Sequence, residues 1–318
     1  EIERVRPSAI LLLGARALHS VARKGGLTKH RLEEMTHTLR DGTIVPMAAA
    51  YHPAAVLYQA NLLSRFRTDL RFFSVMVKGK RLVAGGFASD AVLHATPALL
   101  MRLRRKWAES GAAVSFDAEA DTLTPYVNAS TFAVMMCGLS DGVTTVVASL
   151  DLRPGQQECV GRNAALERGG RGRAYVDVLR AILEDERIRK VAHNGKYDCH
   201  VLRLRFGIEV KNFWLDTIAL HGYVYPVEGG HDLDTVGPEL LAVPRWKGEI
   251  NQYVGESSDP LRYRKVPYDA LARYCARDAL ATARIPGPML RRLKRMDAEA
   301  QSSDVLPGAP GIGGPAAV

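Results

Sequence analysis

Two carboxylates, spaced two residues apart, follow an apolar segment in the middle of the chain. They are Asp117 and Glu119 in Phe116-Asp117-Ala118-Glu119, which ends a predicted strand. Residues i and i+2 of a strand lie on one face of a sheet, so both side chains can converge on one point. Converging carboxylates repel each other unless a cation lies between them, and Mg²⁺ and Mn²⁺ prefer oxygen ligands. The pair indicates a divalent-cation site, although Asp-x-Glu on a strand can also simply face solvent.

A second candidate group lies where a buried strand leads into a helix. In Ala192-His193-Asn194-Gly195-Lys196-Tyr197-Asp198 the residues Asn194 and Asp198 are four apart. That spacing places both side chains on one helical face near the helix N-terminus. A purely structural alternative is an Asn N-cap followed by an Asp that interacts favourably with the helix dipole.

A third group, Tyr274 and Asp278, is again spaced by four residues, within the last convincing helix. The structural alternative is a half-buried tyrosine and an exposed aspartate paired with Arg273 or Arg277. The three groups together, with four carboxylates and one tyrosine in this order, are far more specific than any one of them.

Strands and helices alternate around these groups, which is typical of the α/β class. Three successive strands are expected at 113–116, 131–138 and 144–150, with Asp141-Gly142 as the turn of the last hairpin. The elements expected after them are a mobile loop at 153–173, a helix at 175–183, a strand at 190–193, a helix at 195–206, a strand end and helix at 215–223, and helices at 233–241 and 267–285, the last stopped by Pro286 and Pro288.

The first part of the chain has its own strand-turn-helix pattern. Ala9–Leu13 reads as a buried strand, Gly14 as a tight turn, residues 45–50 as a second strand and 56–73 as a helix. Residues 76–91 fit a linker or hairpin, and Pro97 opens an Arg-rich helix. We therefore expect four segments, at 1–73, 74–110, 111–296 and a Gly/Pro/Ala-rich disordered tail at 297–318.

Charge divides the chain unevenly. The 318 residues hold 43 Lys and Arg against 34 Asp and Glu, and residues 1–110 carry 18 and 8 of these. The basic excess lies in that first third, which suggests a region that meets a polyanion, although a merely solvated basic surface is as consistent with charge alone.

Composition excludes several classes of protein. The longest apolar run is far too short to cross a bilayer and no export signal is readable, so we expect a cytoplasmic protein without membrane contact. The four cysteines contain no Cys-x-x-Cys pair, which argues against a zinc ribbon or a disulfide framework; they are Cys137, Cys159, Cys199 and Cys275.

Residues 111–290 resemble the DEDD exonuclease superfamily in its DEDDy form, most closely the proofreading 3'-5' exonuclease domain of bacterial family A DNA polymerases. The motifs that carry the resemblance are Phe116-Asp117-x-Glu119-x-Asp121-x-Leu123, Asn194-x-Lys196-Tyr197-Asp198 and Tyr274-x-x-x-Asp278. Segments resembling those that the family carries between its second and third motifs are Asp216-Thr217 and His231-Asp232-Leu233-Asp234. Ala118 stands where the family commonly has Thr, which leaves the carboxylates unchanged.

This resemblance implies a ribonuclease H-like fold, a mixed five-stranded sheet flanked by helices, and two-metal hydrolysis with Mg²⁺ or Mn²⁺. Asp117, Glu119 and Asp278 would hold the metal that activates water. Asp117 with Asp198 would hold the metal at the leaving oxygen, and Tyr274 would orient the water. The substrate would be a single-stranded or frayed DNA 3' end, contacted by Asn194 and Lys196, with stacking or wedging candidates Tyr197, His193 and Leu123.

Ala9-Ile-Leu-Leu-Leu-Gly-Ala-Arg-Ala-Leu18 and Tyr51-His52-Pro53-Ala54-Ala55 resemble the C-terminal half of a family 4 type uracil-DNA glycosylase. The resemblance implies that His52 stabilises the leaving uracil anion and that the loop from Pro53 compresses the DNA backbone. The N-terminal half of that family and its cluster cysteines have no counterpart here. Alternatively, His52 is a loop histidine beside a turn-forming proline.

A glycosylase ahead of an exonuclease resembles some phage-type replicative polymerases, so we expect a piece of, or a partner to, a DNA polymerase. Segments 74–110 and 153–173 would then be docking surfaces for a polymerase supplied elsewhere. Two alternatives stay open: a ribonuclease D-like enzyme that trims RNA 3' ends, and a catalytically silent nucleic-acid-binding module. Nothing after Asp278 resembles a polymerase palm or fingers, so synthesis is not expected.

Overall fold

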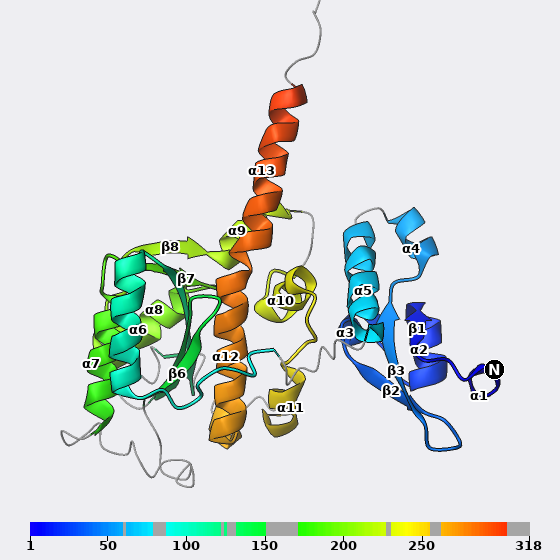
Figure 1. Ribbon diagram of the computed structural model, residues 1–318, viewed down its shortest axis with the longest axis horizontal. Helices are drawn as coiled ribbons and strands as arrows, with labels where there is room; N and C mark the ends of the chain where they lie inside the picture. The colour runs from blue at the N-terminus through cyan, green and yellow to red at the C-terminus, as the bar shows by residue number, and fades with distance from the viewer. Residues whose placement is uncertain are drawn as a thin grey trace, which may run out of the picture.

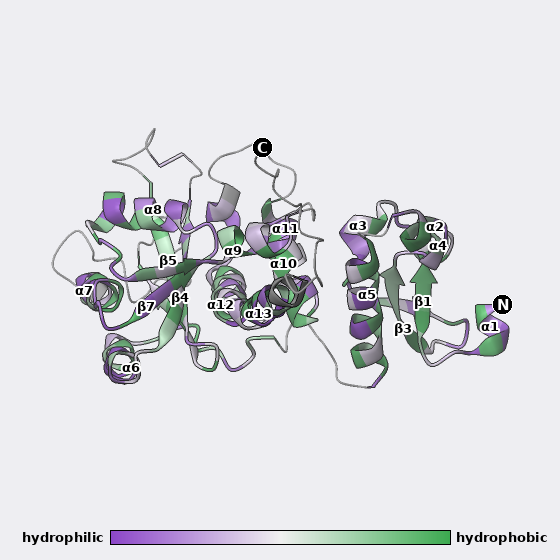
Figure 2. Ribbon diagram, turned by 90° about the horizontal axis from the view of Figure 1, so that it is seen from above, coloured by the Kyte–Doolittle hydropathy of each residue, from purple (hydrophilic) through white to green (hydrophobic). Residues whose placement is uncertain are grey.

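The computed structural model describes residues 1–59, 62–78, 87–121, 124–125, 132–150, 171–226, 230–254 and 262–303. They form two lobes that lie side by side in two perpendicular views (Figures 1 and 2). We call residues 1–78 the small lobe and residues 87–303 the large lobe, in each case as far as they are described. Each lobe has a β-sheet of its own.

The large lobe contains five strands: β4 (Ala113–Ala120), β5 (Val134–Ser140), β6 (Thr145–Ser149), β7 (Arg189–Ala192) and β8 (Phe213–Asp216). Their order in the sheet is β6-β5-β4-β7-β8, and β5 is antiparallel to both of its neighbours while β7 and β8 run parallel to β4. This mixed five-stranded sheet confirms the expected ribonuclease H-like fold.

Helices cover both faces of the sheet. Those of the large lobe are α6 (Pro97–Ser110), α7 (Arg171–Leu183), α8 (Lys196–Phe206), α9 (Thr217–Val224), α10 (Leu233–Leu241), α11 (Gly248–Val254), a 3-10 helix (Arg262–Lys265), α12 (Tyr268–Arg284) and α13 (Pro286–Ser303). Val146 and Ala148 of β6 pack toward α6 and α7, whereas Val147 between them packs toward α12. Figure 2 shows α12 on the opposite side of the strands from α6. The alternation of an apolar strand therefore places two helical layers around one sheet.

Strand β4 extends further than the sequence pattern indicates. We expected a strand at 113–116 with Asp117 and Glu119 at its end, and β4 pairs with β5 as far as Ala120, with a register shift after Glu119. Asp117 and Glu119 consequently lie within a paired strand, and their backbone is held by the sheet.

The small lobe is built on the sheet β1-β3-β2. Its elements are α1 (Ile2–Val5), β1 (Ile10–Leu13), α2 (Gly14–Ala22), α3 (Leu27–His30), β2 (Met35–Thr38), β3 (Ile44–Ala50), α4 (Pro53–Tyr58) and α5 (Leu62–Val77). The strand-turn-helix reading of its beginning is confirmed, with Gly14 at φ +87°. Strand β2 was not expected, because Met35-Thr-His-Thr38 has little apolar character and is held by its antiparallel pairing with β3. The expected helix 56–73 is instead split between α4 and α5.

The end of the large lobe corrects another expectation. Pro286 does end α12, but it also opens α13, which continues to Ser303. A proline lacks the N–H that the first helical residues leave unpaired in any case, so it can start a helix as readily as it stops one. The expected disordered tail from residue 297 is therefore wrong as far as Ser303, and 304–318 lie outside the described residues.

The helix expected from Pro97 is observed as α6, and residues 92–110 of the expected basic linker and helix segment 74–110 pack onto the large lobe. The backbone N–H of Val92 donates to Thr145 O at 3.0 Å, and Val147 N donates to Val92 O at 2.9 Å. Leu100 and Trp107 of α6 are fully buried in the core of the large lobe. None of the helices in the described ranges combines the length and the apolar character that crossing a membrane requires.

The two lobes are joined through a buried arginine of the small lobe. Arg31, only 1% exposed, pairs with Asp69 of its own lobe at 2.8 Å and with Glu239 of α10 at 2.9 Å. Arg245 donates from Nε to Arg31 O at 3.2 Å and from its backbone N to Leu32 O at 3.1 Å. The contact is polar and nearly closed to water, so it holds α10 and the residues after it against the small lobe.

Candidate active site

Strand β4 presents its two carboxylates to one face of helix α12. A carboxylate oxygen of Asp117, one of Glu119 and the Sγ of Cys275 lie within 4.8 Å of one another. Cys275 also donates to Asp117 O at 3.6 Å. Cys275 was not among the residues we singled out, although its position three residues before Asp278 on the same helix would have placed it on that face.

Helix α12 adds Tyr274 and Asp278, which lie on one face as the spacing of four residues predicts. The Tyr274 side chain lies next to the Asp278 carboxylate. Trp246, 2% exposed, donates from Nε1 to Asp278 Oδ1 at 2.5 Å. Asp278 is buried, and its neighbour Arg277 pairs with Glu249 at 2.8 Å, so the alternative of an exposed Asp278–Arg277 pair is wrong.

Asp198 enters the site from the first turn of α8. It is 6% exposed, and its Oδ1 accepts a hydrogen bond from the backbone N–H of Ala118 at 2.8 Å. Ala118 lies between Asp117 and Glu119, so this bond ties α8 directly to the carboxylate-bearing part of β4. Three elements that are far apart in the sequence thereby bring four carboxylates together.

Asn194 does not share a helical face with Asp198. Its φ is +59°, α8 begins only at Lys196, and the N-cap residue is Gly195, which makes no side-chain cap. The N–H groups of Asn194 and Gly195 donate to the two carboxylate oxygens of Asp216 at 2.9 and 3.0 Å. Because Asp216 holds this turn in a left-handed conformation, both the helical-face prediction and the Asn N-cap alternative are wrong.

The residues that we expected to contact the substrate differ in how far they are buried and in what they contact. Asn194 and Lys196 are exposed, and Tyr197 is half-buried next to Asp198. The Nδ1 of His193 lies 2.8 Å from the hydroxyl of Thr217, on the side of α9. Burial lowers the pKa of His193, so its ring is neutral near pH 7. Leu123 lies outside the described residues.

The electrostatics of the site favour a cation. Burial, followed by mutual repulsion, raises the pKa of Asp117 and Glu119 well above the usual range. Burial likewise raises the pKa of Asp198 and Asp278 to about 7. The Oδ2 of Asp117 is buried and has no hydrogen-bond partner among the described residues. An orphaned buried carboxylate oxygen among other carboxylates fits hard divalent ions, which take oxygen ligands.

Burial also raises the pKa of the Cys275 thiol well above its usual range. The thiol is therefore protonated at neutral pH, and thiolate rather than thiol is the metal-binding form. The oxygen donors, and not Cys275, make up the candidate ligand set.

In the small lobe the two motifs that carried the glycosylase resemblance touch each other. A Cβ added at Gly14, directly after β1, would lie 3.2 Å from the Cβ of His52, directly after β3. His52 caps helix α4 by accepting from Ala54 N at 3.1 Å, and Pro53 is the first helical residue. In the structure, His52 is therefore the N-cap residue of α4, and the proline after it opens this helix.

A profile of the 3'-5' exonuclease family matches residues 95–294 of the chain. The chain belongs to this 3'-5' exonuclease family. The match begins just before α6 and ends within α13, and it contains every carboxylate of the site. The small lobe lies outside it.

Relatives of this exonuclease include DNA polymerases. The DNA polymerase I of Rhizobium leguminosarum is 33% identical over 111 residues, which is 34% of this chain and 10% of the polymerase. The chloroplastic/mitochondrial DNA polymerase I A of Arabidopsis thaliana is 28% identical over 166 residues, or 43% of this chain and 16% of the polymerase. The chain thus spans a small part of the polymerases that it matches.

Among solved structures, Brucella melitensis NrnC with bound Mg²⁺ is 22% identical at a TM-score of 0.40, covering 60% of this chain and 78% of that one. The Trypanosoma brucei RNase D–GMP complex is 12% identical at a TM-score of 0.44, covering 66% and 63%.

Proposed function

We propose that this exonuclease removes nucleotides from single-stranded or frayed DNA 3' ends by a DEDDy-type, two-metal hydrolysis. The observation that carries the proposal is the convergence of four carboxylates from β4, α8 and α12, three of them buried and Asp117 half-buried, beside the Tyr274 hydroxyl. Without cations, such a cluster is electrostatically unfavourable, as the raised pKa of each carboxyl indicates.

In the proposed mechanism the carboxylates divide between two cations, Mg²⁺ or Mn²⁺. Asp117, Glu119 and Asp278 would hold one of them, and Asp117 with Asp198 the other. When bound, the cations would supply an activated water and neutralise charge at the leaving oxygen. The Tyr274 hydroxyl, next to Asp278, would orient the attacking water.

The substrate part of the proposal rests on two supports. The curated relatives are DNA polymerases, and the first third of this chain, which includes the glycosylase-like segment, is basic. We therefore propose DNA as substrate and a polymerase as the larger protein or partner. An RNA 3' end is the competing substrate, because the same carboxylates can serve both.

The test is degradation of a 5'-labelled single-stranded DNA oligonucleotide and of an RNA of the same sequence, with Mg²⁺ or Mn²⁺. We expect a ladder that shortens the DNA from its 3' end and that disappears with EDTA and in the Asp117→Ala and Asp278→Ala variants. If the RNA is degraded faster than the DNA, the proposed substrate is an RNA 3' end instead. Binding without degradation under all conditions would identify a silent nucleic-acid-binding module.

We further propose that residues 1–73 are a lobe related to the C-terminal half of uracil-DNA glycosylases and that this lobe does not excise uracil by itself. The contact of Gly14 with His52 supports the relationship, since it joins the two glycosylase-like motifs. On a uracil-containing duplex we expect no release of uracil by the chain or by its His52→Ala variant. Release by the chain and its loss in the variant would contradict this assignment.

A further inference from the structure

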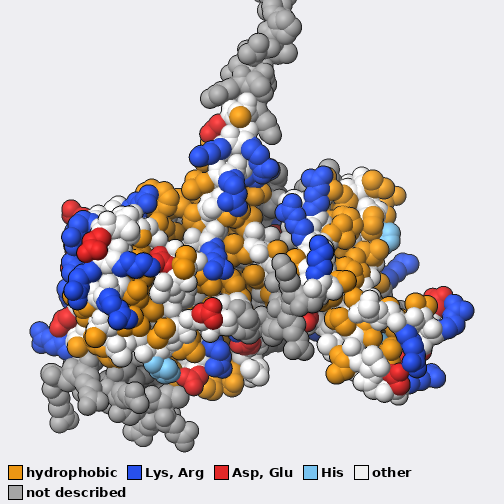
Figure 3. All heavy atoms as spheres, in the orientation of Figure 1, with side chains coloured by type: hydrophobic (Ala, Val, Ile, Leu, Met, Phe, Trp, Pro, Cys, Tyr) orange, Lys and Arg blue, Asp and Glu red, His pale blue; other side chains and the backbone are white. Residues whose placement is uncertain are grey.

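A cavity of about 550 Å³ lies between the lobes and is separate from the carboxylate site. Helix α5 of the small lobe lines one side, and the end of α10 and the first turns of α13 line the other. The space-filling view shows Lys and Arg side chains on both sides of the hollow between α13 and the small lobe (Figure 3). We call this cavity the arginine cleft.

Three guanidinium groups from two lobes face this cleft. Arg71 comes from α5, and Arg291 and Arg295 lie one turn apart on α13. All three are exposed, and none has an ion-pair or hydrogen-bond partner among the residues that the structure describes. The cleft also contains Glu239, but its carboxylate is already bound to Arg31 at 2.9 Å.

An aromatic ring adds a further feature of the cleft. Tyr225 lines it and carries the guanidinium of Arg292 over its ring, at 4.9 Å from the centroid. Cations without local counter-charges, gathered in one hollow, concentrate anions there. Arginine forks match the paired oxygens of phosphate groups and stack on flat rings, as nucleic-acid-binding surfaces do.

One segment of chain, from α10 to Trp246, contributes residues both to the cleft and to the surroundings of the catalytic carboxylates. Glu239 lies in α10 at the cleft, and Trp246, shortly after α10, donates to Asp278 at 2.5 Å. We propose that the arginine cleft binds the phosphodiester backbone of the nucleic-acid substrate at nucleotides beyond the 3' end held in the catalytic site. This inference rests on the proposed exonuclease function and adds a second contact region for the same strand.

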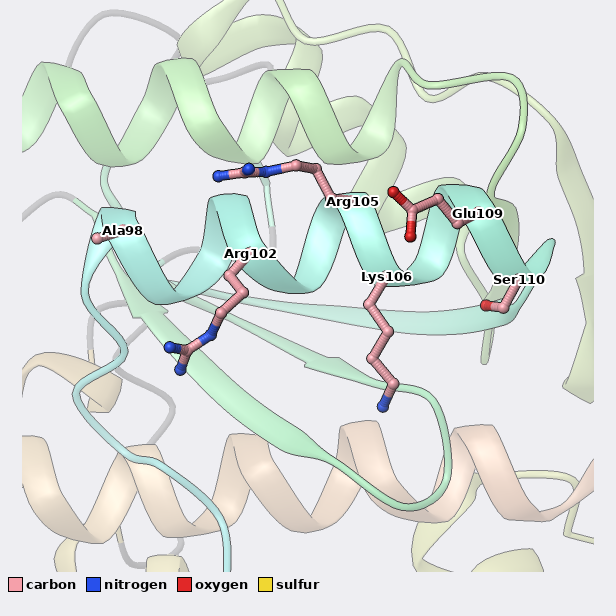
Figure 4. A pocket seen from close by; sticks show the side chains of 6 residues that line it. All are labelled: Ala98, Arg102, Arg105, Lys106, Glu109 and Ser110. Atoms are coloured by element: carbon pink, nitrogen blue, oxygen red, sulfur yellow. The ribbon is translucent and has the colours of Figure 1, made fainter.

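A second basic surface provides a matched control. Arg102, Arg105 and Lys106 project from one helix, α6, together with Glu109 (Figure 4). Lys106 is paired with Asp141 at 3.3 Å, and the surface is formed by α6 alone rather than by two lobes. Neutralising these three residues removes the same charge from the protein as neutralising the three cleft arginines.

The experiment compares the Arg71→Gln/Arg291→Gln/Arg295→Gln variant, the Arg102→Gln/Arg105→Gln/Lys106→Gln variant and the unmodified chain. Affinity for 5'-fluorescent oligo-dT of 4 and 20 nucleotides is measured by anisotropy in EDTA, at several salt concentrations. We expect the cleft variant to bind the 20-mer about tenfold more weakly, with a salt slope smaller by about 2, as three lost phosphate contacts predict for a single strand. Its affinity for the 4-mer and its rate of 4-mer degradation should equal those of the unmodified chain.

Equal binding of the 20-mer by the cleft variant, or an equal loss in the α6 variant, would overturn the inference. A further measurement compares how well poly-glutamate and unlabelled oligo-dT displace the fluorescent 20-mer from the unmodified chain. If both displace it equally well, the inference is overturned in favour of an acidic protein partner. The rate of 4-mer degradation by the unmodified chain separates the two proposals. If the unmodified chain does not degrade the 4-mer, the proposed exonuclease function is wrong. If it degrades the 4-mer but the cleft variant binds the 20-mer as tightly as the unmodified chain, only the proposed role of the cleft is wrong.

Discussion

At the scale of single residues, the Asp278 carboxylate is oriented by a hydrogen bond from a buried indole. The Trp246 Nε1 donates to Asp278 Oδ1 at 2.5 Å, and the Tyr274 side chain lies next to the same carboxylate. Hydrogen bonds to a metal-binding carboxylate set its direction, and their loss typically weakens metal affinity or activity by about 10–100-fold. Trp246 is therefore a positioning residue of the proposed site.

Replacing Trp246 with Phe keeps an aromatic ring and removes the N–H. We expect the Mn²⁺ concentration for half-maximal activity to rise by about tenfold or more, with a smaller loss of stability. The measurement is a metal titration of DNA degradation, alongside thermal unfolding. Trp107→Phe is the control, because that buried indole donates to Asp141 at 2.8 Å, in a hydrogen bond outside the carboxylate cluster. Equal metal requirements in both variants would contradict the positioning role.

The site carboxylates also predict how the metal-free protein responds to pH. Burial raises the pKa of Asp198 and Asp278 to about 7, so the folded chain keeps protons that the unfolded chain releases near pH 4. Their contribution to stability is complete below the unfolded pKa and is lost as pH rises through about 7. We expect the Tm in EDTA to fall by several degrees between pH 5.5 and pH 8.

Added Mn²⁺ should raise the Tm more at pH 8 than at pH 5.5, because the cation binds the ionised carboxylates. The Asp278→Asn variant should show a flatter Tm profile in EDTA than the unmodified chain. A metal-free Tm that does not change across this range would contradict the raised pKa values.

At the scale of elements, α12 must approach the sheet closely to bring its side chains to β4. Gly138 of β5 makes this possible, since a Cβ there would lie 2.8 Å from Cys275 O and 3.0 Å from the Ala279 Cβ. The first of these is a backbone atom of the helix, which cannot move without shifting the site face of α12.

We expect Gly138→Ala to lower both stability, by about 1–3 kcal/mol, and exonuclease activity, because α12 is displaced from β4 and β5. Urea unfolding and the DNA degradation assay measure the two effects. Gly222→Ala in α9 is the control, since a Cβ there meets nothing within 4 Å and alanine favours a helix. Activity in Gly138→Ala equal to that of Gly222→Ala would argue against the close approach as a requirement of the site.

At the scale of the whole molecule, Arg31 joins the two lobes. Its guanidinium binds the buried Asp69 and reaches Glu239 of α10, so removing it leaves carboxylates unpaired in a dry environment. Breaking a buried ion pair from one side costs about 3–5 kcal/mol.

We expect Arg31→Met to lower the Tm by about 6–20 °C and to increase proteolysis between the lobes. Scanning calorimetry and limited trypsin digestion measure these effects. Arg6→Ala is the control, because the Arg6–Asp41 pair at 3.1 Å is on the surface and should have no measurable effect. If Arg31→Met unfolds like the Arg6 variant, the buried pair does not hold the lobes together.

Some features of this protein follow from local residue spacing, whereas others depend on contacts between residues far apart in the sequence. The sequence alone indicated the α/β class, the five strands of the large lobe with most of its helices, and the candidate groups containing Asp117, Asp198 and Asp278; it did not indicate α11, the 3-10 helix or α13. These features depend on residue type and on spacings of two or four residues, which strand and helix geometry converts directly into shared faces. For the same reason the tyrosine and aspartate of α12 could be placed on one face.

The tertiary structure alone decided which distant groups complete the site and the fold. Trp246 contacts Asp278 across 32 positions and Arg31 contacts Glu239 across 208, and no local pattern encodes such pairs. Asn194 left the expected helical face because Asp216, 22 positions away, captures the backbone N–H groups of its turn. Hydrogen bonds and buried ion pairs of this kind depend on which surfaces the fold brings together, and that is settled only when the whole chain packs.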